Sequence, residues 1–232
     1  MAVSQLGGFN SLMYYSPLVF SLVGFANPVA VGTVVAGVNF AFTIVNLLLV
    51  DRVGRRRLLL STVHLMAVAL VVAAVCFRWI RLGQGLEPPP ARADEARVQW
   101  PAVVLLLAIV AYVALYSSGL GNTAWLGSEF FPTEMRAMGT MMLTVTCWAS
   151  NIVVSSTFLT QVEKTTFSGA FGCYAGVCIL GWVFVYFCYP EVKGMALEDT
   201  GHVFQHGFGV KRAAEIQKNA RAAKQNDVPE GA

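Results

Sequence analysis

Six apolar blocks constrain this chain more than any other feature of its sequence, because each has the ~20 residues that a helix needs to cross a hydrocarbon layer. The blocks occupy residues 3–23, 28–50, 58–77, 101–128, 137–160 and 167–189. Hydrophobic residues make up 56% of the chain and charged residues 12%. A soluble domain carries roughly 45–50% apolar and about 25% charged residues. We therefore expect an all-α membrane protein, with six transmembrane helices in 1–189 and a polar tail at 190–232.

The connections between the blocks are short and polar, with one exception. Residues 78–100 contain three consecutive prolines at 88–90 together with glycines and mixed charges. Proline lacks the backbone N–H and clashes with the preceding turn, so this segment is predicted to be a loop. The tail after Pro190 is hydrophilic, and we expect one short helix near 211–224.

The positive charges predict the orientation of the chain. In a six-span topology, the arginines at 52–57, Arg136 and the basic residues of the tail fall on one side, and fewer lysines and arginines fall on the other. Loops rich in lysine and arginine stay in the cytoplasm, so the C-terminus is expected there. The first block begins directly after Met1 without a polar lead, which favours a fragment of a longer protein.

The first block is unusually polar for a membrane span. It contains Gln5, Asn10 and Tyr14 together with a glycine pair and Pro17. A buried amide is costly unless it finds partners, so these groups should face a cavity or another helix. Asn10 and Tyr14 share a helical face, whereas Gln5 joins them only if the helix bends, which the glycines and Pro17 allow. The alternative is that the amides bond neighbouring helices without any ligand.

Further groups suited to a polyalcohol occur in later blocks. Asparagines stand at positions 39, 46, 122 and 151, and a tryptophan stands at 125. An amide both donates and accepts hydrogen bonds, and an aromatic ring packs against the C–H face of a sugar. Each residue alone could serve helix packing. Together they predict a polyol site made by Gln5, Asn10, Tyr14, Asn39, Trp125 and Asn151.

A second set of charges lies at the predicted cytoplasmic face. It consists of Asp51, Arg52, Arg55, Arg56, Glu129 and Arg136. Glu129 lies close to the membrane boundary and needs a cationic partner there. We interpret the set as a cytoplasmic gate that closes in one conformation and opens in another, although the arginines could also serve topology alone.

Other functional classes find little support in the sequence. The five cysteines lie within apolar blocks and form no CxxC pair, and His202 and His206 have no third ligand nearby. No nucleophile–base set, phosphate loop or nucleotide motif occurs, and the net charge of +3 is too small to indicate nucleic acid. We expect no enzyme, cofactor, metal or nucleic-acid partner.

Six motifs in register resemble the sugar porter family of the major facilitator superfamily. Residues 5–10 with Tyr14 and Tyr15 resemble its QLSGIN…YY motif, and 37–39 followed by 51–56 resemble its next helix and loop. The remaining four are 121–125 (GPxPW), 128–136 (SE-x-FP…R), 148–151 (WTSN) and 190–194 (PETKG). The match runs from residue 5 to about 199 and is similar to the second half of the family. Within the family, the sequence of these stretches resembles that of fungal myo-inositol permeases.

The resemblance implies the C-terminal half of a carrier that takes up a cyclitol such as myo-inositol, or a hexose, coupled to protons, at the plasma membrane. It also implies a missing six-helix N-terminal half, which carries the proton-coupling carboxylate. Three positions depart from the family pattern, namely Ser4, Ser117 and Cys147, where glutamine, glutamate and asparagine are usual. These departures argue against glucose. A nutrient sensor and a fragment that does not transport remain open as rivals.

Overall fold

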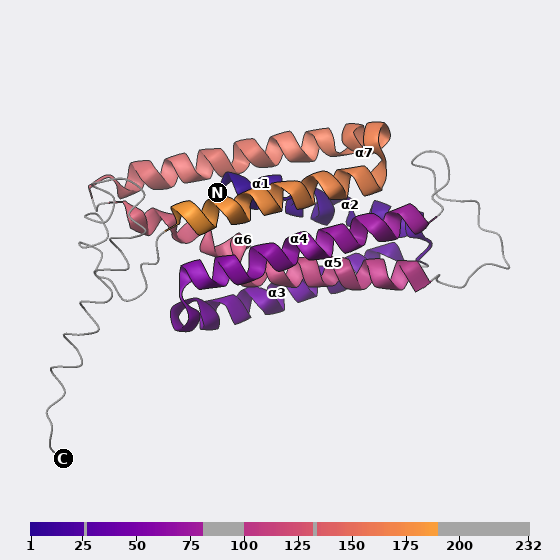
Figure 1. Cartoon of the computed structure of the whole chain (residues 1–232), viewed down its shortest axis with the longest axis horizontal. Coiled ribbons are helices and arrows are strands. Elements are labelled where there is room, and N and C mark those ends of the chain that lie inside the picture. The colour runs from indigo at the N-terminus through magenta and orange to yellow at the C-terminus, as the bar shows by residue number, and fades with distance from the viewer. Residues whose placement is uncertain (26, 81–99, 132–133, 190–232) are drawn as a thin grey trace, which may run out of the picture.

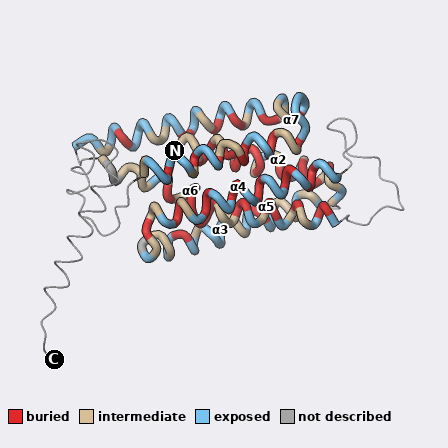
Figure 2. Tube along the Cα trace, in the orientation of Figure 1, coloured by how far each residue is buried: buried red, intermediate tan, exposed pale blue. Residues whose placement is uncertain are grey.

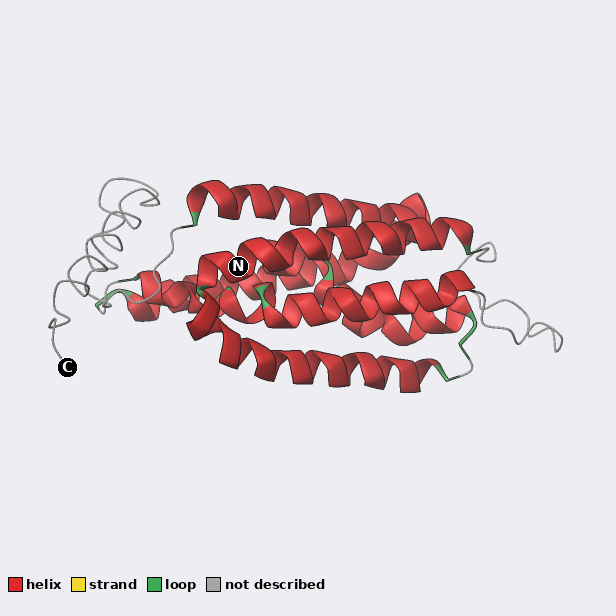
Figure 3. Cartoon of the chain, turned by 60° about the horizontal axis from the view of Figure 1, so that its bottom comes forward, coloured by secondary structure: helices red, strands yellow, loops and turns green. Residues whose placement is uncertain are grey.

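The computed structural model describes residues 1–25, 27–80, 100–131 and 134–189. Every regular element in these ranges is a helix (Figure 3). The elements are α1 (Ala2–Leu6), α2 (Phe9–Val23), α3 (Pro28–Val53), α4 (Arg55–Trp79), α5 (Trp100–Ser118), α6 (Leu120–Thr123), the 3₁₀ turn η1 (Trp125–Phe130) and α7 (Arg136–Cys188). The loop predicted at 78–100 falls almost entirely outside the described residues, and the tail with its short helix lies wholly outside them.

The helices run side by side along the long axis of the molecule (Figure 1). The helix α4 packs against both α5 and α7, and α3 packs mainly against α5. The core consists of side chains such as Met66 of α4, Ile109 of α5 and Phe171 of α7. The surface of α3 is mostly open (Figure 2), and only 11% of its apolar window is buried within the chain.

In the part of the chain that the structure describes, four helical stretches are long and apolar enough to cross a membrane, whereas the sequence predicted six spans. They are Pro28–Val50, Arg55–Trp79, Trp100–Ser128 and Arg136–Cys188. The first predicted span is broken into α1 and α2, so neither piece reaches spanning length. The last two predicted spans both lie within α7, whose two helical arms run on either side of a break at Thr166 (Figure 1).

The turn within α7 lies at a single residue. Thr166 has φ 71° and ψ 164°, while helix continues on both sides of it. Residues 161–165, between the fifth and sixth predicted spans, still belong to the first arm of α7. The two arms, before and after Thr166, run next to each other in Figure 1.

A similar one-residue turn joins α3 to α4. Gly54 has φ 97°, which a residue with a side chain rarely adopts, and its N–H donates to the carbonyl of Val50 at 3.2 Å. Glycine at this position therefore allows the tight turn between α3 and α4. Helix resumes at Arg55, so the arginines at 55–57 form the first turn of α4.

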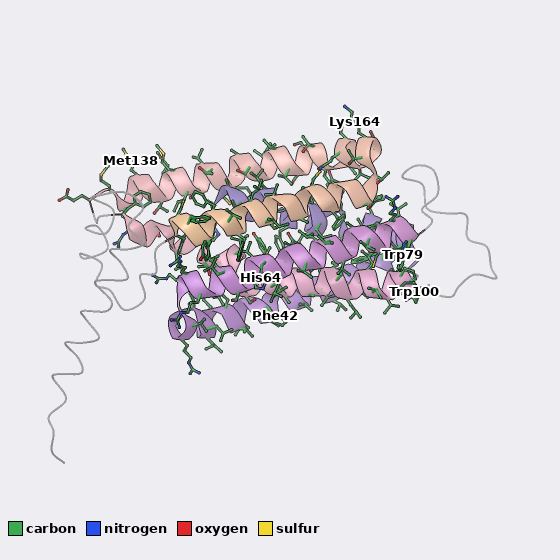
Figure 4. All side chains as sticks on the ribbon, in the orientation of Figure 1. Phe42, His64, Trp79, Trp100, Met138 and Lys164 are labelled. Carbon is green, nitrogen blue, oxygen red and sulfur yellow. The ribbon has the colours of Figure 1, made fainter. Side chains whose placement is uncertain are left out.

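The two ends of the bundle carry different side chains. Trp79 and Trp100 pack edge to face with ring centroids 5.4 Å apart, and Lys164 lies at the same end, while Met138 lies at the opposite end (Figure 4). Tryptophan pairs of this kind are typical of the border between hydrocarbon and water.

Candidate functional site

A break in the first span brings two of the predicted site residues together. The break is at Gly7–Gly8, where Gly8 has φ 86°, and Pro17 lies within the continuous helix α2. The side-chain amide of Asn10 donates to Oε1 of Gln5 across the break. The amide of Gln5 in turn donates to Sγ of Cys147 on α7 at 3.1 Å. Gln5 thus reaches Asn10 because the helix bends. Such a bend was predicted from the sequence as the requirement for this contact.

A second polar group forms where α5 ends. The amide of Asn39 on α3 donates to Oγ of Ser117 at 2.8 Å. Asn122 of α6 donates to the backbone carbonyl of the same serine, also at 2.8 Å. Gly119 interrupts the helix between them, with φ −131° and ψ −92°. Helix breaks that present backbone and amide groups inside a bundle are typical of transporter binding sites.

An aromatic stack connects the two polar groups. The rings of Phe9 and Tyr116 lie parallel, with centroids 3.7 Å apart and 10° between their planes. Phe9 directly precedes Asn10, and Tyr116 directly precedes Ser117. The stack thus holds the backbone next to Asn10 close to the backbone next to Ser117, although the two belong to the first and fourth predicted spans.

Asn151 occupies the first arm of α7, one turn beyond Cys147. Its Oδ1 accepts a hydrogen bond from Oγ of Ser155 at 2.9 Å. Positions 147, 151 and 155 share one helical face because they are four residues apart. Tyr15 reaches this face too, through a 3.4 Å hydrogen bond to the carbonyl of Ser155. The aromatic contact to this face thus comes from Tyr15.

Tyr14 and Trp125 are placed differently from the amides. Their side chains are 59% and 42% exposed. Among the described residues, no hydrogen bond joins either side chain to the amide groups. The surface that carries Tyr14 and Trp125 is therefore not covered by the rest of the chain.

The predicted gate is only partly within the described side chains. Nη2 of Arg56 donates to the backbone carbonyl of Tyr186 at 2.7 Å, which connects the start of α4 to the end of α7. Nε of Arg136 is buried without a hydrogen-bond partner among the described residues. The side chains of Asp51 and Glu129 lie outside the description, so an ion pair between Glu129 and the arginines stays a prediction.

Sequence reasoning missed the roles of Ser117 and Cys147. Both positions were noted only as departures from the family pattern, yet each binds directly to a predicted site amide. The departures themselves could have indicated these contacts, because a shorter side chain replaces a longer one at each position and leaves room for a neighbouring amide. Ser117 leaves its part of the site without the negative charge that a glutamate would bring.

The amide and hydroxyl side chains of the two groups present hydrogen-bond donors and acceptors. Each amide offers two donor hydrogens and an acceptor oxygen, and the mutual bonds of Gln5 and Asn10 use only part of this capacity. Such groups exchange their bonds for those of ligand hydroxyls. The chemistry fits reversible binding of a neutral polyhydroxylated molecule.

A protein-family model described as "Sugar (and other) transporter" matches residues 1–204. The chain belongs to the sugar transporter family. Among curated proteins, the chain is 44% identical over 226 residues to Myo-inositol transporter 1 of Cryptococcus neoformans, covering 96% of the chain and 39% of the relative. It is 37% identical over 220 residues to Myo-inositol transporter 1 of Saccharomyces cerevisiae, covering 95% of the chain and 37% of the relative. The chain thus spans about two fifths of the length of these relatives.

Solved structures agree on the fold. The chain is similar to the proton:xylose symporter XylE of the major facilitator superfamily, bound to 6-bromo-6-deoxy-D-glucose, with a TM-score of 0.73 and 23% identity. That match covers 88% of the chain and 41% of XylE. An inward open conformation of XylE from E. coli gives a TM-score of 0.63 at 20% identity, over 87% of the chain and 42% of XylE. The fold is that of the major facilitator superfamily.

Proposed function

We propose that this sugar transporter chain forms the C-terminal half of a carrier for a cyclitol, with myo-inositol as substrate. The two polar groups around Asn10 and Ser117 bind the ligand near the middle of the membrane. The full carrier works by alternating access, in which one helical bundle rocks against the other around the site. The relatives named as myo-inositol transporters support this choice of substrate.

The observation that carries the proposal is the hydrogen bond between Asn10 and Gln5 across the break in the first span. An unbroken helix would place these two amides on different faces. The break costs backbone hydrogen bonds, and in a membrane such a cost is tolerated where the freed groups line a cavity. A paired amide site beside a broken helix therefore suits a neutral ligand with several hydroxyls.

In this proposal the chain crosses the membrane six times. The segments α1 and α2 together make the first crossing, and the two arms of α7 make the last two. Each arm exceeds the ~20 residues that a crossing needs. The open surface of α3 supports the presence of lipid or of another helical bundle against it. That bundle is the N-terminal half of the carrier.

Proton coupling, the cytoplasmic gate and the plasma membrane complete the proposal. A carboxylate in the N-terminal half supplies the proton site, as the resemblance implies. Asp51, Glu129 and the arginines at 52–56, with Arg136, close the cytoplasmic face, and the C-terminus lies in the cytoplasm. The name of the structural neighbour, a proton:xylose symporter, supports the coupling.

Uptake of radiolabelled cyclitol tests the proposal. Yeast cells without their own inositol carriers express this chain alone, or together with the N-terminal half of the Cryptococcus relative. We expect uptake of myo-inositol with both halves, little competition from glucose or xylose, and loss of accumulation when a protonophore collapses the proton gradient.

Three outcomes separate the alternatives. Uptake with both halves and none with either alone supports the half-carrier. Competition by glucose at concentrations equal to myo-inositol overturns the choice of substrate. Correct delivery of both halves to the cell surface without uptake of any polyol overturns the transport proposal and favours a chain that does not transport.

A further inference from the structure

Two helix breaks in this chain are each closed by a buried side chain that lies outside the proposed ligand contacts. The first break is at Gly7–Gly8 and the second is at Gly119. A break frees backbone carbonyls that would otherwise accept hydrogen bonds within the helix. The side chains that bind these carbonyls come from neighbouring helices.

Tyr112 closes the first break. Its hydroxyl donates to the carbonyl of Gly7 at 3.0 Å, and its side chain is 1% exposed. Tyr112 lies one helical turn before Tyr116 on α5, so both rings face the same way. Tyr116 stacks on Phe9, directly after the break. One face of α5 therefore contacts the chain before the break, at Gly7, and after the break, at Phe9.

Asn46 closes the second break. Its amide donates to the carbonyl of Ser118, and its side chain is also 1% exposed. The preceding carbonyl, that of Ser117, accepts from Asn122 at 2.8 Å. Asn46 lies on α3 two turns after Asn39, which binds the hydroxyl of Ser117. The helix α3 thus contributes one amide to the proposed site and another to the backbone behind it.

The breaks determine where the proposed site residues lie. Gln5 and Asn10 flank the first break, while Asn39 meets its partner at the second. If either break relaxes, the flanking amides no longer point to the same place. Only the fraction of molecules with both breaks in place then binds ligand, so the apparent affinity falls in proportion to that fraction.

We propose that Tyr112 and Asn46 are positioning residues, which set the affinity of the site for polyols without touching the ligand. In this arrangement the Tyr112 hydroxyl and the Asn46 amide each donate to a backbone carbonyl, and both side chains are 1% exposed. The inference rests on the proposed function for its effect on affinity. The effect on the helix breaks is independent of any ligand.

Hydrogen exchange measured by mass spectrometry on the purified chain in lipid nanodiscs tests the breaks directly. Tyr112→Phe keeps the ring and removes only the hydroxyl, so the fold is expected to survive. We expect the amides of residues 4–12 to exchange about tenfold faster, because an unsatisfied buried carbonyl favours local opening. Asn46→Leu should do the same for residues 117–124. Unchanged exchange in both variants overturns the inference.

Tyr186→Phe is the matched control. It removes a hydroxyl from a half-exposed ring at the end of α7, where the ring stacks on Trp182. We expect no change of exchange at either break. Faster exchange in this variant at residues 4–12 would show that any lost hydroxyl loosens the bundle, and it would overturn the specific role of Tyr112.

Uptake kinetics with both halves of the carrier test the effect on affinity. We expect Tyr112→Phe to raise KM about tenfold for myo-inositol and by the same factor for its epimer scyllo-inositol, with Vmax per surface copy unchanged. A merely structural role would lower Vmax and leave KM unchanged, which overturns the inference. Unequal factors for the two epimers indicate ligand contact and overturn it too. Absence of any polyol uptake by the wild type overturns the proposed function and the affinity claim, whereas the exchange result still decides whether the breaks depend on these residues.

Discussion

The sharpest test of the first break is the substitution Gly8→Ala. Gly8 has φ 86°, in the left-handed region, and a Cβ placed there would lie 2.4 Å from Cδ2 of Tyr174. The left-handed backbone costs an alanine about 1–2 kcal/mol. Forcing the aromatic ring aside costs roughly another 1–3 kcal/mol, because a packed interior resists added volume. We expect Gly8→Ala to lower the free energy of unfolding by about 2–5 kcal/mol in total.

Two other glycines separate the two causes. Gly24 has φ 96°, but a Cβ there meets nothing within 4 Å, so Gly24→Ala should cost only the backbone strain of about 1–2 kcal/mol. Gly37 lies within α3, where a Cβ also meets nothing within 4 Å. Gly37→Ala should stabilise the chain by about 0.5–1 kcal/mol, because glycine is a poor helix former.

The assay is reversible unfolding of the purified chain in mixed micelles by added SDS, followed by far-ultraviolet circular dichroism. A double-mutant cycle adds Tyr174→Ala, which removes the ring that Gly8→Ala would displace. The coupling energy of the cycle should equal the steric part, about 1–3 kcal/mol. Equal stability of Gly8→Ala and Gly37→Ala would refute the reasoning. A coupling energy near zero would refute the steric part alone.

Three further predictions concern other positions. Asn39→Ala should abolish myo-inositol uptake without loss of surface expression, because it removes the donor to Ser117 and a proposed ligand contact; unchanged uptake would count against the site. Thr166→Gly should raise the free energy of unfolding by about 1 kcal/mol, since φ 71° with ψ 164° is a conformation suited to glycine, and an unchanged value would contradict the strain. Arg56→Ala should lower the unfolding free energy by roughly 1 kcal/mol through loss of the bond to the carbonyl of Tyr186, and Arg56→Lys should retain part of it; equal values for both variants would contradict this contact.

The pairing of distant site residues was only partly predictable. Gln5 and Asn10 are close in sequence, and the glycines between them indicated that the helix could bend. The contact of Asn39 with Ser117 joins residues 78 positions apart, and no local pattern encodes it. Cys147 as the partner of Gln5 is a similar case, at a separation of 142 positions. Such contacts depend on which helices become neighbours, which hydrophobic periodicity does not specify.

Helix ends, too, were predictable from the local sequence in one case and not in another. The turn at Gly54 was predictable, because glycine followed by arginines interrupts two apolar blocks. The turn at Thr166 was not, since threonine disfavours positive φ and the polar residues before it continue the helix. Packing of the two arms of α7 outweighs that local preference.

The sequence by itself determined that this chain is helical, that it is made for a membrane and that it belongs with sugar transporters, because length, apolarity and local motifs are properties of consecutive residues. The tertiary structure decided which polar groups meet, where the first span breaks and that Tyr112 and Asn46 close the freed carbonyls. The physical reason is that a buried amide, hydroxyl or carbonyl must find a partner, and in a bundle that partner comes from a different helix. Only the packing of the helices selects it.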